Sequence, residues 1–229
     1  MGKVLMSGIV PKLTAPVGGT PLSSLAEGSI IQLNESGSPV DFYVAKHDYE
    51  SGLNGAGRTL LVRKDCCAEM LWATNNVNAY ASSTVNTWLN GTYKSLLDTV
   101  IQTAMGTTKF YFTYGNGNWT KSTMSASAFL LSLTEYGLSS TYSNVEGSAL
   151  PIASVLRIGY LNGSAVRQWT RSPDKSSGKV GLDTTSCACV IRDTGVHDTY
   201  SVSSNGQKPR PAFTLPGSLL FLPDGTIKV

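Results

Sequence analysis

The sequence predicts a single α+β domain with antiparallel sheets, one or two short helices and long loops, preceded by an extended N-terminal arm. Short apolar runs bounded by Gly, Asn and Pro recur along most of the 229 residues, which is typical of antiparallel strands joined by turns. Only one segment, residues 83–104, has apolar side chains at helical spacing. Pro11, Pro16 and Pro21 recur near the start and exclude a long helix there.

Residues 1–24 are the expected arm, and residues 25–229 are the expected domain. The apolar residues of the arm that we expect to serve in assembly are Leu5, Ile9, Val10, Leu13 and Val17. Such a segment is too apolar for a solvated linker. It therefore packs on its own domain or docks on another protein, and the absence of a clear apolar period favours docking.

Three short runs near the start of the domain predict a small antiparallel sheet. Residues 29–33 and 40–45 are expected to pair as a hairpin around the turn at residues 35–39. Residues 59–63 form the next expected strand, after a loop that contains Asn54.

The helical segment at residues 83–104 predicts two helices with one apolar face. Trp88, Tyr93 and Ile101 belong to this face, which should pack on the sheet. Ser82 or Ser83 is the expected N-cap, and Asn90-Gly91 is the expected break between the helices.

The remaining strands are expected later in the chain. Residues 109–114 and 119–121 flank an Asn-Gly dipeptide and predict a hairpin. Residues 128–133 form a continuous apolar run, expected as a buried strand or a short core segment. Residues 218–222 and 226–229 flank a Pro-Asp-Gly turn, so the C-terminus should be tied into the fold.

Composition excludes several classes of function. Charged residues make up 14% of the chain, against about 25% in an average protein. The net charge of +3 is scattered and includes no run of Lys or Arg, which argues against nucleic acid as a partner. No apolar stretch approaches the ~20 residues of a membrane span, and the start lacks the pattern of a signal peptide. We therefore expect a chain made in a cytosol, without membrane insertion.

The search for catalytic motifs yields little, and we expect no enzyme, no cofactor and no metal. The two histidines, His47 and His197, lie outside any recognisable zinc-protease pattern, and no nucleophile-elbow or phosphate-binding glycine motif occurs. Three weak alternatives stay open: a nucleophile pair of Cys187 or Cys189 with His197, a weak metal site of His197 with Asp193 and Asp198, and a carboxylate pair of Glu135 and Glu146.

The four cysteines form two close pairs, Cys66-Cys67 and Cys187/Cys189. Neither pair has the spacing of a zinc knuckle or a thioredoxin-like site. Four free and mostly buried thiols are favoured, and a disulfide between the two pairs is the alternative.

A polar segment, residues 174–208, lies between two motifs that each combine an aromatic residue, an arginine and a proline. The motifs are Gln168–Pro173 and Pro209–Leu215, and Trp169 and Phe213 are large enough to anchor them by burial. We expect the segment to be held outside the core as a binding surface, because Tyr, Ser, Gly and Asn dominate recognition loops. Two core strands joined by a merely soluble loop are the alternative. The candidate binding residues are Asp174, Lys175, Lys179, Asp183, Arg192, Asp193, His197, Tyr200 and Asn205.

Four motifs in fixed order carry a resemblance to a known family. They are Thr87–Tyr93, Phe129–Glu135, Trp169-Thr170-Arg171-Ser172-Pro173 and Arg210–Leu215. Together they resemble an uncharacterised domain family of gut Firmicutes and their phages, with W-x-R-S-P and R-P-A-F motifs, over about residues 25–225. The chain departs from that family at Lys208-Pro209, where Gly-Val is usual.

The same pair of motifs is similar to the C-type-lectin-like and formylglycine-generating-enzyme-like fold, which variable proteins of phages and bacteria use. This resemblance implies that residues 174–207 carry the binding loops and that Trp169, Arg171, Arg210 and Phe213 are framework. The enzyme branch of that fold acts through a cysteine pair. Cys187 and Cys189 do not match it, so the resemblance implies no activity here.

The resemblance implies a phage virion protein attached to the capsid, tail or baseplate through the N-terminal arm, whose opening looks like that of phage structural proteins. The domain would bind a glycan or protein of the host surface, and the protein would form homo-oligomers, with a trimer as one arrangement. The alternatives are a decoration or joining protein without a ligand and, less favoured, a cysteine-dependent enzyme.

Overall fold

The computed structural model describes residues 18–175, 184–222 and 227–228, and within them the fold is mixed α+β with mostly antiparallel sheets, as the sequence predicts. The largest sheet contains, in order, β2 (Ile30–Glu35), β3 (Ser38–Lys46), β4 (Arg58–Arg63), β13 (Ala212–Pro216) and β7 (Ala128–Phe129). Strand β2 alternates exposed and buried residues, with Ile31 and Leu33 facing the core. The expected sheet of residues 30–63 is confirmed, and two strands from far along the chain extend it.

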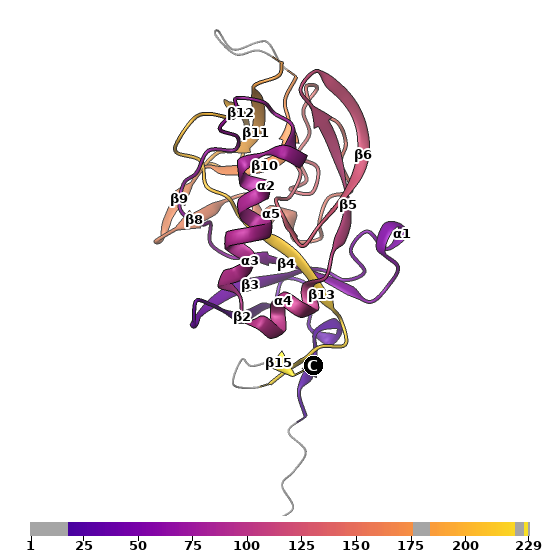
Figure 1. Ribbon diagram of the computed structural model, residues 1–229. Helices are drawn as coiled ribbons and strands as arrows, with labels where there is room; N and C mark the ends of the chain where they lie inside the picture. Colours follow the sequence, from indigo (N-terminus) through magenta and orange to yellow (C-terminus); the bar gives the residue numbers. More distant parts are fainter. Residues whose placement is uncertain (1–17, 176–183, 223–226, 229) are drawn as a thin grey trace, which may run out of the picture.

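A second sheet lies above the first in Figure 1. It contains β10 (Gln168–Pro173), β11 (Cys187–Ile191) and β12 (His197–Ser201) in sequence order, all antiparallel. Smaller strand groups surround the two sheets: the hairpin of β5 (Thr108–Gly115) and β6 (Asn118–Ala126), the hairpin of β8 (Gly159–Leu161) and β9 (Ser164–Val166), and β1 (Thr20–Pro21) with β14 (Leu220–Phe221) and β15 (Ile227–Lys228).

The β5–β6 hairpin confirms the turn predicted from Asn-Gly. Asn116 and Gly117 have φ values of 49° and 79°, the left-handed conformation that this dipeptide adopts most readily. The C-terminal prediction is confirmed as well, because β14 pairs with β15.

The helical layer differs from the prediction in where it is interrupted. Its elements are η2 (Tyr80–Ser82), α2 (Thr84–Trp88), the π-helical turn η3 (Leu89–Tyr93), α3 (Lys94–Leu96) and α4 (Thr99–Met105). Ser83 is the N-cap, since its Oγ accepts a hydrogen bond from the backbone N–H of Asn86 at 3.1 Å. The break predicted at Asn90-Gly91 is wrong: the helical backbone continues through η3, and the chain turns extended only at Leu97.

Short helical segments also occur outside this layer. They are η1 (Leu22–Ser24), α1 (Ser51–Asn54) and α5 (Ala153–Leu156).

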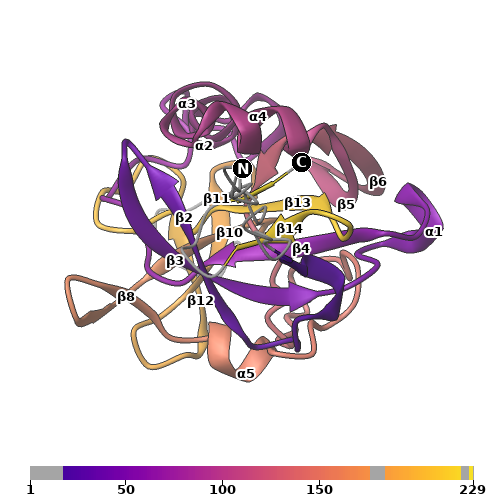
Figure 2. The same cartoon turned by 90° about the horizontal axis from the view of Figure 1, so that it is seen from below.

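One hydrophobic core joins the sheets and the helices. Helices α2 to α4 follow one another down the front of the molecule in Figure 1, and Figure 2 shows that they lie along one side of it. They bury Leu89, Tyr93 and Ile101, so the apolar face predicted from sequence does pack inward. Trp169 of the second sheet and Phe213 of the first belong to the same buried cluster.

The two motifs around the polar segment are bonded directly to each other. The backbone N–H of Trp169 donates to the carbonyl of Lys208 at 3.0 Å, and the N–H of Lys208 donates to the carbonyl of Arg167 at 3.0 Å. Although β10 and β13 belong to different sheets, the chain thus returns to the start of β10 just before it enters β13.

The expectation that residues 174–208 lie outside the core is wrong for their middle part. Strand β11 is the central strand of the second sheet, and all five of its residues are buried. Its sequence, Cys-Ala-Cys-Val-Ile, is apolar in practice, because a free cysteine packs like a small hydrophobic residue.

The two ends of the molecule carry different parts of the chain. Strand β1 pairs with β14 at one end, and the buried Leu22 follows it, so the last residues of the expected arm are joined to the body. Strands β10 to β12 lie toward the opposite end (Figure 1). The arm residues Leu5, Ile9, Val10, Leu13 and Val17 lie outside the described residues.

Candidate functional site

Arg171 is fully buried and links three parts of the fold. Its Nε donates to the carbonyl of Tyr111 at 2.8 Å, and its Nη1 donates to the carbonyl of Leu130 at 2.8 Å and to Oε2 of Glu135 at 2.6 Å. The guanidinium also lies over the ring of Phe110, 4.8 Å from its centre. Burial alone would lower the pKa of Arg171, but the Glu135 carboxylate outweighs this effect and raises it. Arg171 is therefore a charged anchor inside the core.

Glu135 and Glu146 are both fully buried around this anchor. Glu135 accepts a second hydrogen bond, from the hydroxyl of Tyr49 at 2.5 Å, and Glu146 accepts one from Oγ of Ser172 at 2.6 Å. Burial raises the pKa of Glu146. Each carboxylate thus holds part of the W-x-R-S-P motif in place, which corrects the alternative of an accessible acid–base pair.

The other framework residues are buried as well. The guanidinium of Arg210 donates to three backbone carbonyls, those of Arg63 at 2.8 Å, Leu156 at 2.7 Å and Lys64 at 2.6 Å. Nε1 of Trp169 donates to the carbonyl of Met70 at 2.9 Å. Phe213 packs edge-on against Phe42, with ring centres 5.4 Å apart. These contacts fix the two strands from which the polar segment starts and to which it returns.

The structure divides the candidate binding residues between different places. Lys175 is half-buried, and its N–H donates to the carbonyl of Tyr142 at 2.9 Å, so it lies beside an exposed tyrosine. Asn205 is exposed in the loop after β12. Exposed Asp193 and half-buried Arg192 belong to the β11–β12 turn, beside Arg157. Lys179 and Asp183 lie outside the described residues.

Three further candidates lie in or against the second sheet. Tyr200 is half-buried, and its ring packs under the guanidinium of Arg167, 4.9 Å from the ring centre. Asp174 is fully buried, so the expectation that it contacts a ligand at the surface is wrong. Its carboxylate instead accepts a hydrogen bond from Oγ1 of Thr199 at 2.6 Å and lies 3.6 Å from Nε2 of the partly exposed His197.

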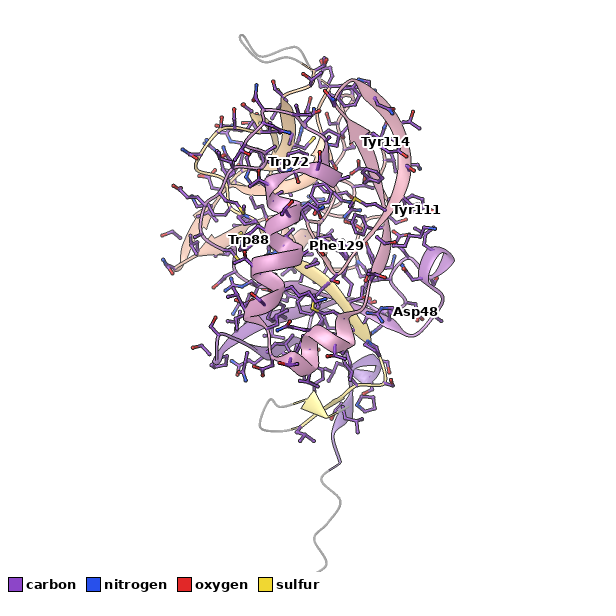
Figure 3. All side chains as sticks on the ribbon, in the orientation of Figure 1. Asp48, Trp72, Trp88, Tyr111, Tyr114 and Phe129 are labelled. Atoms are coloured by element: carbon purple, nitrogen blue, oxygen red, sulfur yellow. The ribbon has the colours of Figure 1, made fainter. Side chains whose placement is uncertain are left out.

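Exposed tyrosines that the sequence analysis did not single out lie beside Lys175 and on the β5–β6 hairpin. Tyr142 and Tyr114 are 49% and 44% exposed, and Figure 3 shows Tyr114 near the tip of the β5–β6 hairpin. Nδ2 of Asn144 donates to the carbonyl of Trp119 at 2.6 Å, which ties the Tyr142 loop to β6. We call Tyr114, Tyr142, Val145 and Lys175 the distal face. In the sequence, the tyrosine among Ser and Thr residues at 139–143 could have indicated a recognition loop.

The four cysteines are free, as the sequence analysis favours. Cys187 and Cys189 are fully buried. Burial and the nearby Asp174 raise the pKa of the Cys189 thiol well above its ordinary value. A protonated and buried thiol is a poor nucleophile.

Residues 56–217 match the family described as a domain of unknown function, DUF6273. The chain belongs to the DUF6273 family. The matched segment contains all four motifs of the sequence analysis and every framework residue. No curated protein and no solved structure matches the chain. DUF6273 therefore supplies a family for the chain and leaves its activity open.

The end of the molecule opposite the distal face carries an apolar groove, which is lined by residues inside the DUF6273 segment and by three residues just beyond it, Ser218, Leu219 and Leu220. Helix α4 and the chain between β13 and β14 line about 640 Å³ of space there, with Val100, Ala104, Leu219 and Leu220 as the apolar residues. Strand β1 pairs with β14 beside it. In the part of the chain that the structure describes, no helix is long and apolar enough to cross a lipid bilayer.

Proposed function

We propose that this protein is a structural protein of a phage virion that presents a C-type-lectin-like module to a glycan or protein of the host surface. Its N-terminal residues attach it to the capsid, tail or baseplate, and the distal face binds the host. One observation carries the proposal: β1, to which the N-terminal segment connects, lies at the end of the molecule opposite β10–β12 (Figure 1). A displayed binding module needs this arrangement.

The frame around residues 174–208 supports the likeness to C-type-lectin-like domains. Its two motifs meet through the backbone of Lys208, and each is held by a buried arginine. The pairing of β1 with β14 places the start and the end of the described chain together. A rigid body whose loops leave from fixed strands is the usual scaffold for recognition loops.

The chemistry of the distal face supports a glycan or a polar protein surface as the ligand. A tyrosine ring offers apolar area at a small entropic cost, and its hydroxyl offers a hydrogen bond. Exposed Tyr142 lies beside Lys175 in a loop with further Ser and Thr hydroxyls, and that loop is bonded to the hairpin that carries exposed Tyr114. Tyr142 is the residue that we expect to contribute most, because it is the more exposed of the two and adjoins Lys175.

The two roles can be separated on particles. Deletion of residues 1–17 should remove the protein from purified virions, whereas Tyr142→Ala should leave its copy number unchanged and lower adsorption to host cells at least about tenfold, as loss of a binding hot spot would. Tyr160→Ala is the matched control, since Tyr160 is 42% exposed on β8, away from the distal face. Equal adsorption by the two tyrosine variants would contradict the binding role.

The apolar groove favours a second candidate, a joining protein that packs against a second copy of this chain and binds no host ligand. Apolar surface of this kind buries well against the apolar N-terminal segment of a neighbouring copy. For such a protein, deletion of residues 1–17 should abolish assembly, and every variant of the distal face should adsorb like the wild type.

A further inference from the structure

Three side chains of metal-ligand type converge on one face of the second sheet. Cys189 of β11 pairs with Thr199 of β12, and Ile191 pairs with His197. Because side chains alternate along a strand, Cys189, His197 and Thr199 lie on the same face of the sheet. Asp174 follows β10 directly, and its N–H donates to the carbonyl of Cys187 at 3.0 Å, which aims its carboxylate at this face.

The distances among the three ligand atoms are short. Oδ2 of Asp174 lies 3.6 Å from Sγ of Cys189 and 3.6 Å from Nε2 of His197, and all three atoms lie within 4.8 Å of one another. Zinc bonds of ~2.0–2.3 Å at tetrahedral angles place two ligand atoms about 3.3–3.6 Å apart. The Asp174 carboxylate already has this spacing to both partners. A small side-chain rotation of His197 or Cys189 would bring Nε2 and Sγ to the same spacing from each other.

The Nε2 atom of His197 gives independent evidence that a ligand binds here. Nε2 of His197 is buried and has no hydrogen-bond partner among the residues that the structure describes. A buried polar atom left unpaired costs free energy, so native structures rarely contain one without a reason. The other histidine is different: Nδ1 of His47 contacts Oγ1 of Thr59 at 2.9 Å and its Nε2 contacts the carbonyl of Leu25 at 2.8 Å.

We propose that Asp174, Cys189 and His197 bind one Zn²⁺ ion. Thiolate, imidazole and carboxylate together suit zinc, whereas magnesium and calcium take oxygen ligands. On coordination the Cys189 thiol releases its proton to solvent. The His197 side chain is 22% exposed, so the ion enters from that side and a water molecule completes the tetrahedron. Thr199 holds the carboxylate in place through its hydroxyl, at 2.6 Å.

Such an ion would clamp the end of β10 to both β11 and β12. Strands β11 and β12 are both part of the polar segment between the two motifs. The role is structural and does not depend on whether the distal face binds a host ligand.

The test uses the full chain, stripped with a chelator and titrated with Co²⁺ and then with Zn²⁺. We expect one Co²⁺ to bind per chain and to give an absorption band from thiolate-to-cobalt charge transfer. One equivalent of Zn²⁺ should displace the Co²⁺ and remove the band. Cys189→Ser should abolish the band, and His197→Gln should weaken Zn²⁺ binding by more than the ~10–100-fold that loss of an outer-shell partner costs. Because His197 is partly exposed, we expect His197→Gln to fold, so it tests the metal site even if Cys189→Ser does not fold.

Cys187→Ser is the matched control, because Cys187 lies on the same strand, is equally buried and is not one of the three ligands. It should keep the charge-transfer band and the Zn²⁺ affinity of the wild type. The proposal is overturned if the wild type shows no charge-transfer band, or if His197→Gln binds Zn²⁺ as tightly as the wild type.

Discussion

Arg171 of the W-x-R-S-P motif binds residues that are far from it in the sequence. It joins β10 to Tyr111, Leu130 and Glu135 inside the core, with no exposed surface of its own. A buried ion pair is not a large net source of stability, but removal of one partner leaves the other charge uncompensated. The motif is therefore expected to be intolerant of change at Arg171 for structural reasons.

Arg171→Met should lower the free energy of unfolding by about 3–5 kcal/mol, because Glu135 would remain as a buried charge without its cation. Urea unfolding monitored by fluorescence measures this change. Lys64→Met is the control, since it breaks the more exposed Lys64–Asp41 pair and should cost about 0–1 kcal/mol. If Arg171→Met with Glu135→Gln were no more stable than Arg171→Met alone, the uncompensated charge would not be the cause.

Glu146 should give the protein a measurable dependence of stability on pH. Burial raises its pKa in the folded state, so between its ordinary pKa and the raised one the folded state binds more protons than the unfolded state. The resulting contribution to stability is present below the ordinary pKa and is lost as pH rises through the raised pKa. Glu146→Gln should therefore gain stability relative to the wild type as pH rises above the ordinary pKa of a glutamate, as urea unfolding at a series of pH values would measure. A constant difference would contradict this.

Single residues with local roles are predictable from sequence, and residues that act across the chain are not. Ser83 as an N-cap and Asn116-Gly117 as a turn depend only on their neighbours, and both predictions are confirmed. Glu135 was visible as a carboxylate after an apolar run. Its partner Arg171 lies 36 residues away, and only the fold brings the two together.

At the scale of elements, β11 and the helical layer show where pattern recognition fails. Strand β11 sits among polar residues, so its five buried residues do not stand out as a strand. In the helical layer, the Asn90 amide donates to the carbonyl of Ala128 and its Oδ1 accepts from the N–H of Ala128. This tertiary contact is made from the π-helical turn η3, at the place where the local sequence, Asn90-Gly91, predicts a break in the helix.

The β5–β6 hairpin depends on a close backbone approach that a mutation can test. A Cβ at Gly115 would lie 2.0 Å from the carbonyl oxygen of Asn78, whereas a Cβ at Gly117 would meet nothing within 4 Å. Both glycines have positive φ, so alanine is strained at either position by about 1–2 kcal/mol. Gly115→Ala should cost about 1–3 kcal/mol more than Gly117→Ala because its backbone must move. Thermal and urea unfolding of the two variants give the difference, and equal costs would contradict the contact.

Asn78 explains why this contact matters to the second sheet. Its Oδ1 accepts from the N–H of Asn116 at 2.7 Å, and its Nδ2 donates to the carbonyl of Cys187 at 2.7 Å. One buried amide thus connects the tip of the hairpin to the start of β11. A hairpin displaced by Gly115→Ala would also disturb the strand that contains Cys189.

At the scale of the whole molecule, the arrangement of the chain is simple although its motifs are scattered. Strands β1, β14 and β15 form a small sheet at one end, and β10, β11 and β12 lie toward the other (Figure 1). The sequence predicts the two motifs and their arginines as framework. It does not predict that the loop of Tyr142 contacts both Lys175 and the β5–β6 hairpin, because nothing local links residues 119, 142 and 175.

The binding of purified full-length protein to intact Firmicutes cells tests the central claim most directly. The wild type and Tyr160→Ala should bind a host strain with the same affinity, and Tyr142→Ala should bind at least about tenfold more weakly. If no strain in a broad panel binds the wild type, or if Tyr142→Ala binds like the wild type, the distal face is not a host-binding surface.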